Sequence, residues 1–212
     1  MPMKRLISSD YVVSRWSGGT TTQLCIAPEG AVYGERNFLW RVSSATVELA
    51  ASEFTPLPDY CRWITTLNGC ITLTHNDGAP VRLLPYDIHE FDGGARTTCL
   101  GRCTDFNLML RKEMCRGSLR HLRISAGDKA DIGFTLKPNP LLPHSALLIH
   151  CSTGSGTLTS GSASISLSTG ESVLAEAKDA ASLTLVADEP GDFLVAEILW
   201  KESFMQGAHL PG

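Results

Sequence analysis

Apolar and polar residues alternate along this sequence in short runs, separated by Gly, Pro, Asn and Asp. Ala163–Ser168, Thr46–Leu49 and Cys70–Thr74 each follow this period of two, which is typical of a β-strand with one face in a core. No segment shows a convincing amphipathic helix pattern. Many short strands joined by turns predict an all-β fold, either a sandwich or a barrel.

A weak internal repeat divides the chain. Three segments recur at an offset of 84 to 89 residues: Leu67–Gly69 with Ser152–Gly154, Val81–Leu83 with Ile165–Leu167, and Phe106–Leu110 with Val195–Leu199. Two copies of one β unit explain the constant offset, although short hairpins can also resemble one another by chance. We predict a barrel over residues 1–115, a Gly- and Pro-rich connector over 116–143 and a second barrel over 144–212. Strands near the N-terminus could complete the second barrel.

Several motifs resemble those of the HutD/Ves family, whose members are double cupins. They are Phe38–Ser43 (F-x-W-R-x-S in the family), Glu53–Gly69 and Asp105–Arg111 (D-F-N-x-M-x-R). The resemblance implies two jelly-roll-like barrels. It also implies a link to histidine utilisation for some members and to stress response for others. The segment after Trp16 departs from the family pattern, because an Asn is missing and Gln23 stands where Glu is usual.

Strand alternation collects polar residues on one face. Asp105, Asn107 and Met109 share a face of their predicted strand, opposite Phe106 and Leu108. By the same rule, Arg41 and Ser43 lie opposite Trp40 and Val42. If the apolar faces form the core, the polar faces can line a barrel mouth, where barrels often bind small ligands. We predict a ligand-binding set of Trp16, Arg41, Arg62, Asp105 and Asn107.

The chemistry of this set favours a polar or carboxylate metabolite. Arg41 and Arg62 offer forked donors suited to a carboxylate, Asn107 can donate and accept, and Trp16 can form an aromatic wall. A purely structural interpretation competes with this one. Arg41 and Asp105 could form a buried ion pair, Asn107 could satisfy backbone groups at a bulge, and the glycines after Trp16 could belong to a plain loop.

Metal and nucleophilic chemistry find little support. None of the six histidines forms an H-x-H pair with a nearby Glu, and His89 and Glu90 are adjacent, so they face opposite ways on a strand. We therefore expect no metal and no cofactor. No G-x-S-x-G elbow or paired carboxylates are evident. Enzymatic activity is uncertain, and the sequence leans against it.

Composition narrows the partners and the compartment. Lys and Arg total 18 against 22 for Asp and Glu, a net charge of −4, which argues against nucleic acid. No apolar run reaches the roughly 20 residues of a membrane span. After Lys4 and Arg5 only Leu6 and Ile7 are apolar, so we expect no signal peptide and a cytoplasmic protein with reduced thiols. Cupins often pair through sheet edges, which leaves a homodimer open.

These observations lead to one main hypothesis and two alternatives. The main hypothesis is a metal-free bicupin that binds a small polar or anionic metabolite in its N-terminal barrel, as a sensor or accessory protein. One alternative is a metal-independent enzyme, an isomerase or hydrolase, that uses the same barrel. The other is a protein-interaction module without a ligand.

Overall fold

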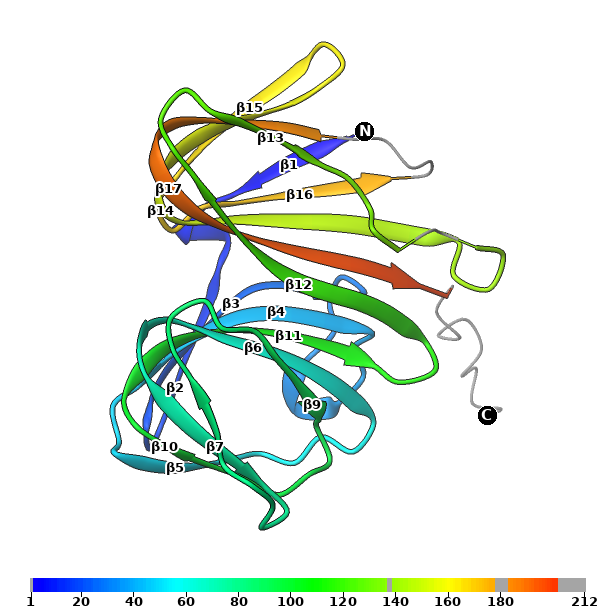
Figure 1. Cartoon of the computed structure of the whole chain (residues 1–212). Coiled ribbons are helices and arrows are strands. Elements are labelled where there is room, and N and C mark those ends of the chain that lie inside the picture. Colours follow the sequence, from blue (N-terminus) through cyan, green and yellow to red (C-terminus); the bar gives the residue numbers. More distant parts are fainter. Residues whose placement is uncertain (1, 137–138, 178–182, 202–212) are drawn as a thin grey trace, which may run out of the picture.

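Strands dominate the computed structural model, which describes residues 2–136, 139–177 and 183–201 (Figure 1). Its helical elements in those ranges are two short 3-10 turns, Ser8–Asp10 and Tyr33–Glu35. The all-β prediction is confirmed. Among the described residues, no helix has the length and apolar character that crossing a bilayer requires.

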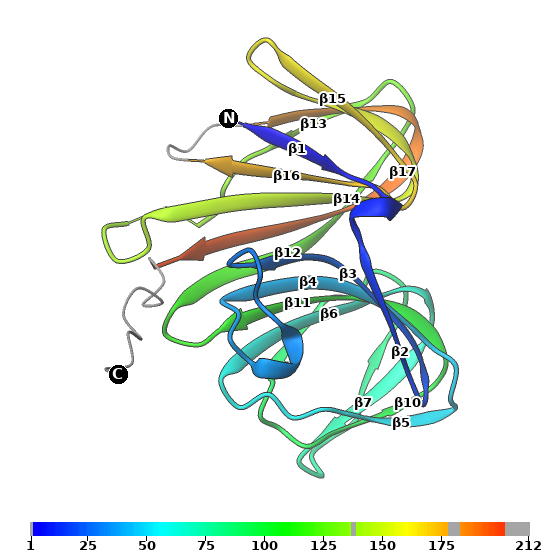
Figure 2. The same cartoon turned by 180° about the vertical axis from the view of Figure 1, so that it is seen from behind.

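Two sheets form the N-terminal half. A six-stranded sheet has the order β2 (Val12–Trp16), β3 (Gly19–Ala27), β4 (Trp40–Val47), β11 (Cys103–Arg111), β6 (Tyr60–Gly69), β9 (His89–Asp92). A four-stranded sheet has the order β5 (Ala51–Phe54), β10 (Thr97–Leu100), β7 (Ile71–His75), β8 (Val81–Leu83). Residues of both sheets, among them Ile64 and Leu73, form one buried cluster, so the two sheets enclose a common interior. Figure 2 shows the segment between β3 and β4, with its short helical turn, lying against the six-stranded sheet.

One sheet of seven strands forms the C-terminal half. Its central path is β1 (Met3–Leu6), β16 (Ser172–Ala177), β14 (His144–Ser160), β17 (Leu183–Trp200), β12 (Cys115–Ile124), with β13 (Lys129–Ile132) on β17 and β15 (Ala163–Ser168) on β14. The long strands β14 and β17 curve through the whole half (Figure 1). The N-terminal strand β1 belongs to this sheet, and β12 and β13 lie largely within residues 116–143. The domain limits stated above stay a prediction.

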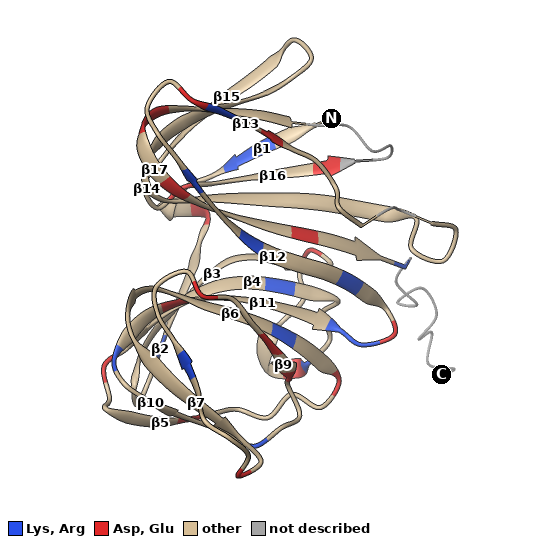
Figure 3. Ribbon diagram, in the orientation of Figure 1, with Lys and Arg blue, Asp and Glu red and all other residues tan. Residues whose placement is uncertain are grey.

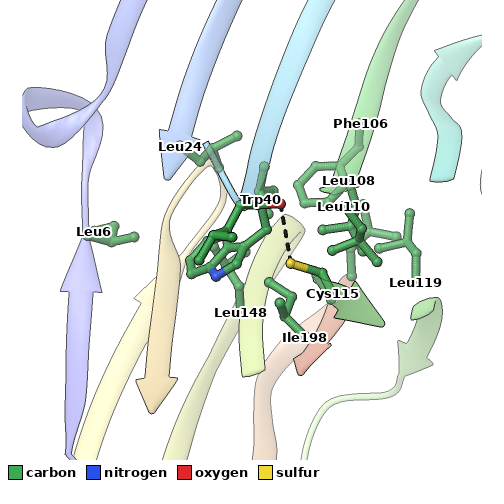
Figure 4. Packing of buried hydrophobic residues seen from close by; sticks show 14 residues of the cluster. Leu6, Leu24, Trp40, Phe106, Leu108, Leu110, Cys115, Leu119, Leu148 and Ile198 are labelled. Atoms are coloured by element: carbon green, nitrogen blue, oxygen red, sulfur yellow. Dashed lines mark hydrogen bonds between the residues drawn. The ribbon is translucent and has the colours of Figure 1, made fainter. Parts of the chain in front are cut away.

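The two halves share an apolar core. Trp40 of β4 and Leu108 of β11 face Leu148 of β14 and Ile198 of β17, and each of these side chains is at most 1% exposed (Figure 4). Burying a side chain of this size stabilises a fold by about 1.5–3 kcal/mol. Charged residues of both signs occur in both halves instead of segregating by half (Figure 3). The core fixes the outward face of β4 and β11, so their remaining side chains must point into the N-terminal sandwich.

A buried histidine lies close to this shared core. His150 of β14 packs against Phe106 at a ring-centroid distance of 5.2 Å, and its Nδ1 lies 2.9 Å from the Ser172 hydroxyl. Burial lowers the pKa of His150 to about 4. The imidazole is therefore neutral in the folded protein over a pH range in which an unfolded histidine takes up a proton.

This histidine makes stability sensitive to acid. Between about pH 6.5 and pH 4 the unfolded chain binds the extra proton, so the contribution of His150 to the unfolding free energy falls by roughly 1 kcal/mol per pH unit as pH decreases. His150→Asn keeps a side-chain donor near Ser172 and removes the titration. Urea unfolding from pH 7 to pH 4 should give a smaller loss of stability for the variant. Equal slopes for both proteins would contradict this assignment.

Candidate functional site

A cavity of about 250 Å³ opens into the N-terminal sandwich. The structure places all five residues of the predicted set in its lining: Trp16, Arg41, Arg62, Asp105 and Asn107. They come from β2, β4, β6 and β11, which are distant in sequence but, apart from β2, adjacent or nearly adjacent in the sheet. Lining residues that the sequence did not reveal include Ser14, Thr21, Tyr33, Glu53, Phe54 and Thr55.

Strand alternation explains why β11 serves both the core and the cavity. Asp105, Asn107 and Met109 line the cavity, whereas Phe106 and Leu108 lie in the core between the halves. The register aligns Asn107 with Ser43 of β4 and with Ile64 of β6. The only register shift of β11 against β6 lies between Thr104 and Asp105. Asn107 itself is therefore in regular strand geometry against both neighbouring strands, and its side-chain oxygen accepts a hydrogen bond from Arg62.

Neutral groups hold the Arg41 guanidinium. Its Nε donates to Oε1 of Gln23 at 2.7 Å, and its Nη1 donates to the Ser43 hydroxyl at 3.0 Å. The guanidinium also lies over the ring of Tyr33, 4.4 Å from the centroid. Arg41 is 5% exposed, and burial lowers its pKa. Gln23 occupies the position where a Glu would neutralise this charge, so the guanidinium keeps a full positive charge toward the cavity.

Arg62 is buried next to aromatic rings. Its Nε donates weakly to Oδ1 of Asn107 at 3.4 Å, and its guanidinium carbon lies 4.8 Å from the ring centre of Phe54 and 5.1 Å from that of Phe91. Burial lowers the pKa of Arg62 to about 10. Within the described residues, neither Nη1 nor Nη2 makes a hydrogen bond. Arg62 is thus a second buried cation with free donors.

Asp105 is the carboxyl group nearest to these cations, but it forms no ion pair with either. No salt bridge within 4.0 Å joins it to Arg41 or Arg62 among the described residues; its Oδ1 accepts the backbone N–H of Ala45 at 3.2 Å. Burial raises the pKa of Asp105 to about 7, although both arginines lower it. The buried ion pair considered from the sequence is therefore not formed. Near neutral pH the cavity lining carries the two arginine charges, the partly protonated carboxyl group of Asp105 and, at an exposed position, the carboxyl group of Glu53.

Trp16 stands at the rim of the cavity and is 39% exposed. Its indole covers Gly18, because a Cβ atom added there would lie 2.0 Å from the ring. Gly19 has a φ of +151° and leaves no room for a Cβ beside the Thr46 carbonyl. The glycines therefore serve the hairpin geometry, and they also place the indole at the cavity. A ligand-contacting role for Trp16 stays a prediction.

The described histidines and cysteines lie outside the lining of this cavity. No group of three or more His, Cys, Asp or Glu side chains lies close enough to hold a metal ion in the part of the chain that the structure describes. The seven cysteines all lie in that part and are free. Burial raises the pKa of the Cys61 thiol to about 12 and that of Cys99 to about 11, which disfavours a reactive thiolate. One close pair, His75 and His89, was not predicted, because these histidines come from different sheets.

Comparisons with known proteins point to the same family as the sequence motifs. The family model described as HutD matches residues 8–195. A conserved protein of unknown function from Pseudomonas aeruginosa PAO1 is 22% identical, with a TM-score of 0.79 over 93% of this chain and 99% of that one. HutD from Pseudomonas fluorescens SBW25, solved in a formate condition, is 19% identical, with a TM-score of 0.73 over 94% and 100%.

More distant structures share the fold alone. The pirin YhhW from Escherichia coli, solved in complex with nickel(II), is 8% identical, with a TM-score of 0.67 over 92% of this chain and 98% of that one. No curated protein matches this sequence. The cupin-like neighbours confirm the predicted double-cupin fold class. Because the family model covers most of its length, this chain belongs to the HutD family.

Proposed function

We propose that this HutD-family protein binds a small metabolite bearing a carboxylate in the N-terminal cavity and acts as a sensor or accessory protein. One observation carries the proposal: Arg41 and Arg62 are both buried in the cavity lining, and no carboxylate lies within ion-pair distance of either among the described residues. Burying a charge without a counter-ion is costly. A bound anion supplies the missing counter-ion.

The unbonded guanidinium donors of the two arginines suit a carboxylate, which has two acceptor oxygens, better than a ligand group with one acceptor atom. Among the described residues, Arg62 retains both Nη1 and Nη2 as an unbonded planar fork, and Arg41 adds its unbonded Nη2 from a second strand of the cavity lining. Planar guanidinium groups bind carboxylates through paired hydrogen bonds. The amide of Asn107 adds a group that can donate or accept.

The remaining walls suit a small, partly apolar ligand body. Trp16, Tyr33, Phe54 and Met109 supply apolar surface around the charged groups. A cavity of about 250 Å³ is below the size of sites for drug-sized ligands. The expected ligand is therefore a small metabolite with one carboxylate at the arginines. The family resemblance relates such a role to histidine utilisation or stress response.

Removal of either cation should weaken binding strongly. Arg41→Gln and Arg62→Gln each delete one guanidinium while keeping a polar side chain, so formate or acetate should bind at least tenfold more weakly. At a concentration near ten times the dissociation constant, either anion should stabilise the wild type by about 1.4 kcal/mol. Melting curves at matched ionic strength, with sodium chloride as reference salt, measure this shift.

Arg5→Gln is the matched control for these variants. Arg5 is exposed in the C-terminal half, where it pairs with Glu171 at 2.6 Å, so its loss should leave the acetate-dependent shift unchanged. Both cavity variants should stay folded without ligand, because each removes a buried, unpaired charge. Unfolding of both variants would instead assign the two arginines to the framework.

Gln23 offers a test that adds charge instead of removing it. Gln23→Glu places a carboxylate at the position of the Gln23 amide, whose oxygen lies 2.7 Å from Nε of Arg41. The new carboxylate should pair with the guanidinium and neutralise the positive charge that would otherwise attract the ligand. We expect a higher melting temperature without ligand and about tenfold weaker acetate binding by calorimetry. Gln23→Ala removes the hydrogen bond without adding charge, so it should weaken binding less. Equal losses for both variants would contradict the electrostatic explanation.

Asp105 should make binding depend on pH. Its carboxyl group, with a pKa near 7, is largely ionised at pH 8 and then repels an anion at the neighbouring arginines. Asp105→Asn should therefore bind acetate several-fold more tightly than the wild type at pH 8, and the two proteins should converge toward pH 5.5. Calorimetric titration at both pH values measures the difference. A constant ratio of affinities would contradict this role.

A further inference from the structure

His75 and His89 form a hydrogen-bonded pair inside the N-terminal sandwich. Nε2 of His75 lies 2.9 Å from Nε2 of His89, and Nδ1 of His75 lies 2.8 Å from the Thr97 hydroxyl. We assign the single proton of that hydroxyl to the Ala95 carbonyl, 3.1 Å away, so that the hydroxyl oxygen accepts the Nδ1 proton of His75. His75 therefore carries its lone pair on Nε2, and His89 donates its Nε2 proton to it.

Phe91 connects this pair to the cavity. The ring of Phe91 stacks on His75 at a centroid distance of 4.7 Å and on His89 at 5.8 Å. The same ring lies 5.1 Å from the Arg62 guanidinium carbon. The ring of Phe91 therefore lies against both the histidine pair and the Arg62 guanidinium.

Burial and nearby positive charges disfavour protonation of the neutral histidine pair. Burial and the positive charges of Arg62 and a protonated His89 lower the pKa of His75, and burial lowers that of His89. Glu90 is the one carboxylate that acts on His89 in the opposite direction.

The other charged groups near these strands contribute little. Arg82 of β8 is the register partner of Thr72, so it lies on the opposite face of the sheet from His75. Asp77 and Arg96, in the turns that follow His75 and precede Thr97, are bonded to each other and exposed. Glu53 stands at the cavity itself. Arg62 lowers the pKa of His75, so it is the fixed charge through which the cavity can act on the pair, by way of His75.

We propose that the His75–His89 pair takes up one proton when a carboxylate binds at Arg62, so that anion and proton strengthen the binding of each other. The proposal rests on the carboxylate-binding function and assigns a regulation to the same site. The incoming proton binds Nδ1 of His89, which makes no hydrogen bond within the described residues. The resulting imidazolium keeps donating its Nε2 proton to His75, so the pair stays intact and carries one positive charge.

Linkage fixes the sign of the effect. A bound carboxylate offsets the charge of Arg62, so the pair binds a proton more readily, and the protonated pair must attract the anion by the same factor. At the separation of neighbouring side chains, such a coupling is about 0.5 pH unit, or about threefold in affinity. Binding should therefore strengthen as pH falls through the titration of the pair. Asp105 acts in the same direction and must be removed to see this effect.

The first experiment needs no ligand. Imidazole ¹⁵N NMR titration, with signals assigned by His75→Gln and His89→Gln, gives the macroscopic pKa of the pair in the full chain. Arg62→Gln should raise it by about 0.5 unit, whereas Arg62→Lys keeps the charge and should leave it near the wild-type value. His121, which is bonded to Asp192 in the other half, is the internal control and should not move. An unchanged pair in Arg62→Gln would overturn the proposal.

The second experiment measures acetate binding by calorimetry from pH 8 to pH 5 in the Asp105→Asn background. Affinity should rise about threefold as pH falls, and adding His89→Gln should abolish the rise. A pH-independent affinity in the Asp105→Asn protein would overturn the linkage while leaving carboxylate binding intact. If acetate and formate bind at no pH, the carboxylate-binding function fails and the linkage fails with it.

Discussion

Side-chain alternation along β4 and β11 is the constraint on which the site depends. One face of these strands carries Trp40, Phe106 and Leu108, which are buried in the core between the halves. The opposite face must then enter the N-terminal sandwich, and it carries Arg41 and Asn107. A slip of one residue would exchange the two faces and bury the cations in the apolar core. The contact between the halves therefore fixes the register of the polar groups, although it lies on the far side of the sheet from them.

The electrostatics of the cavity follow from the partners that the fold provides. The Arg41 guanidinium is held by an amide and a hydroxyl, and Asp105 is held by a backbone N–H instead of an arginine. These contacts orient the groups without cancelling their charges. A cluster of this kind is less stable than a closed ion pair, because each buried charge keeps part of its desolvation cost. The carboxylate ligand that we propose would neutralise these uncancelled charges, and Phe91 lies between Arg62 and the histidine pair.

Much of the site could be predicted from the sequence, because residues i and i+2 of a β-strand lie on the same face of the sheet. That rule assigned Asp105 and Asn107 to one face, and family motifs pointed to Arg62. Tyr33 was not predicted as a cavity residue, because it lies in the irregular segment between β3 and β4, where side chains follow no regular alternation. The His75–His89 pair was not predicted for a different reason. The two residues belong to different sheets that face each other, and the spacing of residues in the sequence does not give the distance between two sheets. The proposed Arg41–Asp105 ion pair failed because sharing a face does not bring two side chains within ion-pair distance.

The two halves repeat a fold but not a chemistry. In the C-terminal half, the inward faces of β14 and β17 carry Leu147, Ile149 and Phe193, all fully buried, where the N-terminal half carries arginine and asparagine. The buried carboxylate of Glu197 is the instructive exception. It accepts hydrogen bonds from the Thr135 hydroxyl and from a backbone N–H at 2.6 Å each, so its acceptors are satisfied within the chain. The N-terminal cations have neutral hydrogen-bond partners for only some of their donors and no counter-ion among the described residues, and a buried charge without a counter-ion is costly. These two unpaired charges therefore lower the stability of the N-terminal half, and the carboxylate binding that we propose would offset that cost.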